Sequence, residues 1–114
     1  MNLDDVMSEL RVEYLESFEE KVKKLAENFK AGSLNEIELE FHKMKGTGQT
    51  YGIDEISTLG MVMERLCQNH PNKLGDTLED AIELINQIVA SRSNNEAFPL
   101  EENPKYLNLL NESQ

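Results

Sequence analysis

A chain of 114 residues fits one domain with a modest core and is too short for two. Its hydrophobic fraction of 39% and charged fraction of 29% indicate a globular protein rather than a disordered one. The formal net charge of -11 argues against nucleic acid and anionic membranes as partners, because both would be repelled. No apolar run approaches the ~20 residues that span a bilayer, and the start lacks the features of a secretory signal. We therefore expect a cytoplasmic, non-membrane protein.

A first helix is predicted from apolar residues that recur every three or four positions. This stripe comprises Val6, Leu10, Tyr14, Phe18, Val22, Leu25 and Phe29. Ala31 and Gly32 should end the helix, because glycine readily adopts the left-handed conformation of a helix cap. Ser33 follows, with Glu36 three residues later, which predicts a capping box that opens a second helix.

The second and third predicted helices each carry one apolar stripe. The stripe of the second comprises Leu34, Ile37, Phe41, Met44 and Gly48, and a turn is expected at residues 50–52. Asp54 is a candidate cap for the third helix, which should end at residues 69–71, where a proline cannot continue it. The stripe of the third comprises Ile56, Leu59, Met63 and Leu66.

A fourth helix is predicted to begin between residues 71 and 76 and to end between residues 91 and 95. Its stripe comprises Leu74, Leu78, Ile82, Ile85 and Val89, widened by Ala81 and Ile88. Four amphipathic helices with short connections predict an all-α fold, an antiparallel four-helix bundle over residues 1–93.

Residues 94–114 form a short C-terminal extension, in which Pro99 and Pro104 interrupt the helical pattern. Its apolar cluster comprises Tyr106, Leu107, Leu109 and Leu110. Two interpretations stay open. The extension is either a tail that lies on the bundle or frays, or a short amphipathic helix presented to a partner.

Residues 41–52 carry the candidate chemistry. At about 100 degrees of rotation per residue, Phe41 and Met44 point inward and His42 lies on the flank of the buried stripe. Helical side chains lean toward the amino terminus, so a large residue at Gly46 would lean across the imidazole. Glycine costs a helix about 1 kcal/mol relative to alanine, and such a cost without a folding gain often marks a functional place. We interpret Gly46 as an opening beside His42.

Two lysines bring positive charge to this stretch of an acidic protein. Lys45 lies within one turn of His42, where its ammonium can reach an anion attached to the ring, and Lys43 adds charge nearby. Neutral imidazole is a good nucleophile near pH 7. Phosphoryl transfer depends mainly on positioning and charge neutralisation, which a docked partner and its metal can supply. The combination predicts phosphoryl transfer through His42.

The order histidine, any residue, apolar residue, lysine, glycine, with a further glycine ten residues after the histidine, resembles the histidine-containing phosphotransfer (HPt) domain family. The matching residues are His42, Met44, Lys45, Gly46 and Gly52. Apolar and acidic positions on the family's next helix resemble Ile56, Leu59, Met63 and Glu64. The resemblance covers roughly residues 8 to 92 and leaves the extension outside it.

The resemblance implies a four-helix bundle whose exposed histidine accepts a phosphoryl group from an aspartyl phosphate on a response-regulator receiver domain and passes it to another receiver. By position, His42 would be the phosphoacceptor, Lys45 would stabilise the phosphate, Gly46 would keep the approach open and Gly52 would let the helix turn. Phe41 departs from the small residue common before the histidine, and we expect altered packing rather than lost function. The chain would be a phosphocarrier and not an enzyme. It would hold no cofactor or metal of its own, and Mg²⁺ is expected in the partner receiver. A hybrid histidine kinase is a further candidate partner.

Three more residues are candidate contacts for a partner. Leu39 lies about 60 degrees around the helix from His42 and is either an isolated surface leucine or an apolar docking contact. Gln49, two turns beyond His42, either hydrogen-bonds toward the site or is solvated. Lys43 is the third candidate.

The sequence does not support nucleotide binding or a metal site. The glycines of residues 46–52 have the wrong spacing for nucleotide-binding loops and follow a helix, so the chain is not expected to be a complete histidine kinase. His42, His70 and Cys67 lack metal-ligand spacing; His70 is expected to be solvated and Cys67 to be a reduced side chain near the core. The remaining alternative is a helical docking module that binds a receiver or another signalling protein without being phosphorylated. The start of the sequence favours a free-standing relay over an excised domain.

Overall fold

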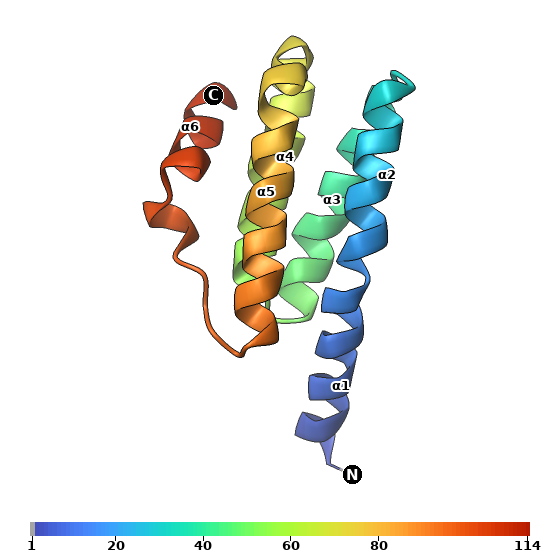
Figure 1. Cartoon of the computed structure of the whole chain (residues 1–114), viewed down its shortest axis with the longest axis vertical. Helices are drawn as coiled ribbons and strands as arrows, with labels where there is room; N and C mark the ends of the chain where they lie inside the picture. The colour runs from blue at the N-terminus through green and yellow to red at the C-terminus, as the bar shows by residue number, and fades with distance from the viewer. Residues whose placement is uncertain (1) are drawn as a thin grey trace.

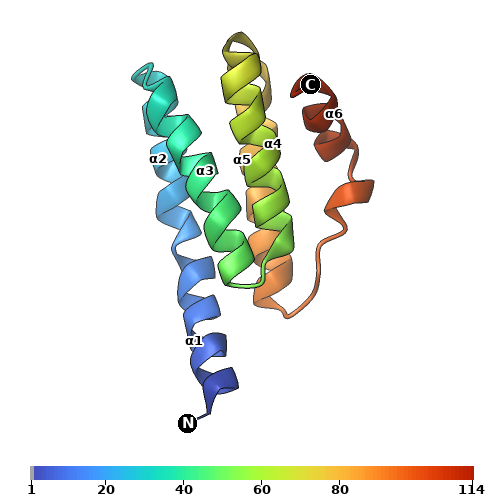
Figure 2. The same ribbon diagram turned by 180° about the vertical axis from the view of Figure 1, so that it is seen from behind.

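The structure is a computed structural model that describes residues 2–114, and within this range it contains helices and no strands. The α-helices are α1 (Leu3–Glu16), α2 (Phe18–Lys30), α3 (Leu34–Thr50), α4 (Asp54–Asn69), α5 (Leu74–Ser93) and α6 (Pro104–Glu112). Two short 3-10 helices, η1 (Pro71–Lys73) and η2 (Leu100–Glu102), precede α5 and α6. The rods α1–α2, α3, α4 and α5 alternate in direction, and α6 lies against α4 and α5 (Figure 1 and Figure 2). The predicted all-α bundle is confirmed.

The first rod consists of two helices in line, where the sequence predicted one. The break falls at Ser17, whose hydroxyl donates a hydrogen bond of 2.5 Å to the carbonyl oxygen of Tyr14 and accepts one of 2.5 Å from Lys21 Nζ. A serine hydroxyl that bonds back to a preceding carbonyl bends a helix. The backbone of Ser17 still accepts a hydrogen bond from the amide of Lys21, so α2 continues in the direction of α1.

The first turns of α1 project beyond the end of the bundle (Figure 1). Val6 and Leu10, which the periodicity placed in the buried stripe, are each 37% exposed, so that prediction was wrong. Phe29 and Leu34, beside the turn between α2 and α3, are also exposed. Periodicity identifies the apolar face of a helix, but it does not tell where the neighbouring helices end.

Glycine sets both turns that flank α3. Gly32 and Gly52 have φ angles of 71° and 73°, in the left-handed region that favours glycine, as predicted. The predicted capping box is absent, because the side chain of Ser33 makes no capping hydrogen bond, although α3 begins directly after it. Asp54 is the first residue of α4 rather than its cap, and Ile53 takes the cap position.

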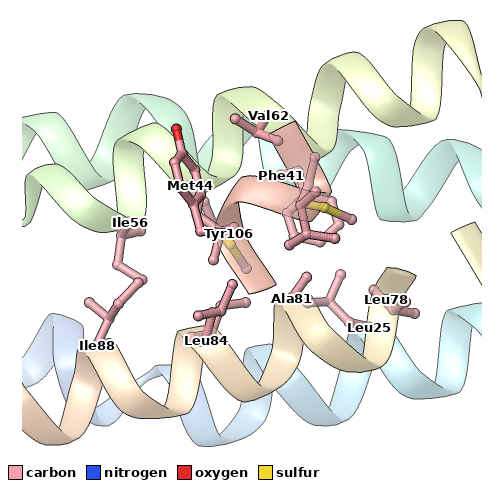
Figure 3. Close-up of a cluster of buried hydrophobic side chains, with 14 of the residues drawn as sticks. Leu25, Phe41, Met44, Ile56, Val62, Leu78, Ala81, Leu84, Ile88 and Tyr106 are labelled. Carbon is pink, nitrogen blue, oxygen red and sulfur yellow. The ribbon is translucent and has the colours of Figure 1, made fainter. Parts of the chain in front are cut away.

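The core lies between the α1–α2 rod, α3, α4 and α5, and α6 completes it on one side (Figure 3). Most of the predicted stripes of α3, α4 and α5 are buried. Leu84 is fully buried although it was outside the predicted stripe of α5, whereas Ile82 and Val89 are only partly buried. A central helix that contacts several neighbours buries more than a single stripe.

The C-terminal extension contributes to the same core through Leu100, Tyr106 and Leu109. Asn103 caps α6 by accepting hydrogen bonds from the amides of Lys105 and Tyr106. The apolar cluster of the sequence is divided, because Tyr106 and Leu109 are buried, while Leu107 is 48% exposed. The extension is therefore a helix docked on the bundle.

Candidate functional site

His42 lies on α3 between the buried Phe41 and the exposed Lys43, and its side chain is 59% exposed. Its Nδ1 atom is 2.5 Å from Oε2 of Glu64 on α4. Lys45, one turn further along α3, donates a hydrogen bond of 2.8 Å from Nζ to the other oxygen, Oε1 of Glu64. One carboxylate from α4 therefore joins the imidazole and the ammonium that the sequence placed side by side on α3.

The Glu64 side chain is 12% exposed, and the charge state of its carboxyl group follows from two opposing effects. Burial disfavours the ionised form, but the hydrogen bonds from Lys45 and His42 outweigh it, so the pKa of Glu64 is below its ordinary value. An ionised carboxylate only accepts hydrogen bonds, so Nδ1 of His42 is the donor. In a neutral imidazole whose Nδ1 carries the proton, the free lone pair is on Nε2. The contact with Glu64 therefore leaves Nε2 as the ring nitrogen that is not bound to this carboxylate.

Three glycines lie within the helices around this site, and only two of them are needed for packing. A Cβ atom at Gly48 would lie 2.6 Å from the Ser57 amide nitrogen, and one at Gly60 would lie 2.8 Å from the Lys45 amide nitrogen. A Cβ atom at Gly46 would meet nothing within 4 Å. The close approach of α3 and α4 therefore explains Gly48 and Gly60, whereas Gly46 leaves open space beside His42.

The C-terminal end of α3 and the turn after it contact α1. The hydroxyl groups of Tyr14 and Thr47 are hydrogen-bonded at 2.8 Å, and the Tyr14 ring stacks on Tyr51 at a centroid distance of 4.5 Å. Arg11 donates from Nε to the carbonyl oxygen of Tyr51, at 2.8 Å, in the turn that contains Gly52. These contacts anchor the C-terminal end of the helix that carries His42 to α1.

The three residues predicted to contact a partner, Leu39, Lys43 and Gln49, are all exposed on α3. Leu39 is 44% exposed, and Met61 on α4, which the sequence reasoning did not single out, is 39% exposed. Glu64 had been noted only as part of a family resemblance, with no contact assigned to it. Its position 22 residues after His42 carries no local signal, because helical spacing relates residues within one helix only.

The remaining polar candidates lie away from this site. His70 was expected to be solvated in a loop, but its Nε2 atom is 2.7 Å from the carbonyl oxygen of Gln114, so that prediction was wrong in part. Cys67 is buried as expected, and burial raises the pKa of its thiol to about 11. Within residues 2–114 no group of three or more potential ligand side chains is placed to hold a metal ion. No helix in the same range is long and apolar enough to cross a membrane.

A helical bundle that presents an exposed histidine, bound at one ring nitrogen to a carboxylate and accompanied by a lysine, is a framework suited to carrying a group on the other ring nitrogen. A sequence model of the Hpt domain matches residues 9–94, and the chain belongs to this family. The predicted family resemblance is thus confirmed. Hpt domains are phosphocarriers in histidine phosphorelay signalling and interact with receiver domains. No curated protein and no solved structure matches the chain.

Proposed function

We propose that this protein is a phosphorelay intermediate that carries a phosphoryl group on Nε2 of His42. The donor is an aspartyl phosphate on a response-regulator receiver domain, and the acceptor is the aspartate of another receiver. The observation that carries the proposal is the pair of hydrogen bonds from His42 and Lys45 to the single carboxylate of Glu64. This arrangement orients the ring and leaves Nε2 as the free nitrogen.

The transfer step uses groups that are already in place. The lone pair of Nε2 forms a bond to phosphorus, the bond from phosphorus to the aspartyl oxygen breaks, and the aspartate leaves as a carboxylate. The ring gains positive charge as it is phosphorylated, and the ionised Glu64 stabilises that charge through the proton on Nδ1. In the reverse direction the same steps deliver the group to the next receiver.

Lys45 and Gly46 serve the incoming phosphoryl group. The Lys45 side chain is 40% exposed, and its ammonium can turn from Glu64 toward phosphoryl oxygens on the neighbouring ring. The open space at Gly46 gives the donor aspartyl phosphate room to approach. Most of the remaining charge neutralisation comes from the Mg²⁺ ion of the partner receiver domain, so this chain acts as a carrier that needs no cofactor of its own.

The partners are receiver domains in the cytoplasm, including that of a hybrid histidine kinase. Leu39, Lys43 and Gln49 form their contact surface on α3, since all three are exposed on the helix that carries His42. Leu39 supplies an apolar anchor, and Lys43 supplies a charge opposite to that of an acidic receiver site.

Incubation with a panel of phosphorylated receiver domains tests the proposal. The wild-type protein should gain phosphate that is labile in acid and stable in base, with a ³¹P signal of Nε2-phosphohistidine. His42→Gln should gain none while keeping its helix content, and His70→Gln is the matched control that should be phosphorylated normally. Phosphate on His42→Gln, or none on the wild type with any receiver, would overturn the relay. Receiver binding without phosphate would instead support the docking module, which the exposed Leu39 favours.

A further inference from the structure

We infer that a close seam between α3 and α4, formed by Gly48, Ser57 and Gly60, sets the position of Glu64 relative to His42. Gly60 and Ser57 are then positioning residues for phosphoryl transfer, although neither touches the phosphoryl group. The inference deepens the proposed function and rests on it, because it names residues that control the reactivity of the same imidazole.

Gly60 permits the closest approach of α4 to the helix that carries His42. A Cβ atom at residue 60 would lie 2.8 Å from both the carbonyl oxygen of Phe41 and the amide nitrogen of Lys45, whereas ordinary Cβ contacts lie between 3.4 and 4 Å. Both atoms belong to the backbone of α3, so no side chain could rotate away to make room. Any larger residue at this position must push the two helices apart.

Gly48 on α3 and Ser57 on α4 close the same seam. A Cβ atom at Gly48 would lie 2.6 Å from the Ser57 amide nitrogen. The Ser57 hydroxyl donates a hydrogen bond of 2.7 Å to the carbonyl oxygen of Lys45. This bond ties α4 to the backbone of the residue whose ammonium binds Glu64, so it opposes sliding of one helix along the other.

The seam and the site lie one helical turn apart. Gly60 precedes Glu64 by four residues on α4, and Phe41 and Lys45 flank His42 on α3. Glu64 is 2.5 Å from His42 and 2.8 Å from Lys45, and a hydrogen bond is lost when the separation of its heavy atoms reaches about 3.6 Å. Separation of the helices at Gly60 therefore loosens both contacts and frees the imidazole to rotate and to exchange its tautomers.

The decisive variant is Gly60→Ala, compared with Gly75→Ala. Gly75 lies in α5, where a Cβ atom would meet only the ring of Phe29 at 3.5 Å, an ordinary contact. Gly60→Ala should bind receivers as the wild type does but accept phosphate about tenfold more slowly, because misplacement by less than 1 Å weakens catalysis strongly. Gly75→Ala should match the wild type in both measurements.

The ¹⁵N resonances of the His42 ring supply a readout that needs no phosphate. In the wild type they should show the proton on Nδ1, and in Gly60→Ala they should show a mixture of the two tautomers. If the wild type takes no phosphate while the tautomers shift as expected, the proposed relay is refuted and the positioning of Glu64 by the seam is supported. An unchanged tautomer in Gly60→Ala would refute the inference that the seam positions Glu64 relative to His42.

A double variant separates positioning from a general loss of packing. In a Glu64→Ala background the seam has nothing left to position, so adding Gly60→Ala should slow transfer no further. Equal slowing in both backgrounds would refute the inference. If Gly60→Ala does not fold, Ser57→Ala provides the same comparison, because it removes only the hydroxyl that bonds to the Lys45 carbonyl.

Discussion

In the proposed phosphoryl transfer, the two hydrogen bonds that Glu64 accepts would have different fates. The bond from Nδ1 of His42 strengthens as the ring gains positive charge, because a charged donor bonds more strongly to a carboxylate than a neutral one. The bond from Lys45 is exchangeable, since a phosphoryl group on Nε2 offers its ammonium a second acceptor. In the proposed transfer, Glu64 would thus keep Lys45 beside the ring until the phosphoryl group arrives.

The role of Gly46 can be tested by substitution, because nothing in the fold requires a glycine there. Gly46→Ala should stabilise the protein by up to about 1 kcal/mol through helix propensity. Gly46→Glu should retain the fold but slow phosphoryl transfer about 100-fold or more, because its carboxylate would lean over the ring and repel phosphate. Thermal unfolding and single-turnover transfer measure the two effects. Equal transfer rates for Gly46→Glu and the wild type would contradict the role of this opening.

At the scale of helices, the ends of the elements were predictable where local chemistry determines them. Gly32, Gly52 and Pro71 mark connections because of their own backbone geometry, and each lies where a connection was expected. The bend at Ser17 was missed, because a serine within an amphipathic pattern gives no sign that its hydroxyl will bond back to the helix. The exposure of Val6 was missed because it depends on where other helices end.

In the candidate site, too, contacts within one helix were predictable from the sequence and contacts between helices were not. His42, Lys45 and Gly46 belong to one helix, so their spacing alone places them together. The contact with Glu64 and the approach at Gly60 depend on the crossing of α3 and α4, and no periodicity within one helix specifies the register of two.

Glu55 connects α4, α5 and the C-terminal extension. It is buried, and it accepts hydrogen bonds from the Arg92 guanidinium and from the amide of Phe98. Burial acts to raise the pKa of Glu55, but the bonds from Arg92 and Phe98 outweigh it and leave that pKa below its ordinary value. The ionised form is therefore the one that holds the extension in place.

The stability difference between the wild type and Glu55→Gln should depend on pH. Because folding lowers the pKa of Glu55, its contribution is complete above the pKa of an unfolded glutamate, about 4.3, and is lost as pH falls through the lower folded value. Near pH 7 the substitution should cost about 1–3 kcal/mol, since it weakens a buried charged pair. Denaturant unfolding at several pH values measures this difference, and comparison of the two proteins cancels the titration of all other groups. A difference that does not shrink in acid would contradict the proposed ion pair.

Across the molecule there are 22 acidic and 11 basic residues, so at least half of the carboxylates have no cation to themselves. Such an excess keeps a protein soluble but opposes the compact state through mutual repulsion. The ion pairs within residues 2–114 join separate helices, as Lys45 with Glu64 joins α3 to α4, and Arg92 with Glu55 joins α5 to α4.

Added salt should therefore stabilise this protein. Raising the ionic strength from about 0.01 M to about 0.15 M shortens the Debye length from about 30 Å to about 8 Å, which screens repulsion across the bundle more than the short ion pairs. We expect Tm to rise over this range, by the same amount in sodium chloride and potassium chloride. A falling Tm would mean that the interhelical ion pairs outweigh the repulsion.

The engagement of Nδ1 with Glu64 has a kinetic consequence. Because Nδ1 is hydrogen-bonded to Glu64, Nε2 is the single atom that would exchange the phosphoryl group with every donor and every acceptor. Two receivers could not bind at this atom together. The proposed relay would then follow double-displacement kinetics, in which the first receiver departs before the second arrives. An excess of unphosphorylated acceptor receiver would bind the unphosphorylated protein and delay its phosphorylation. The rate of signal transfer would then depend on the residence time of each receiver as well as on the rate of phosphoryl transfer.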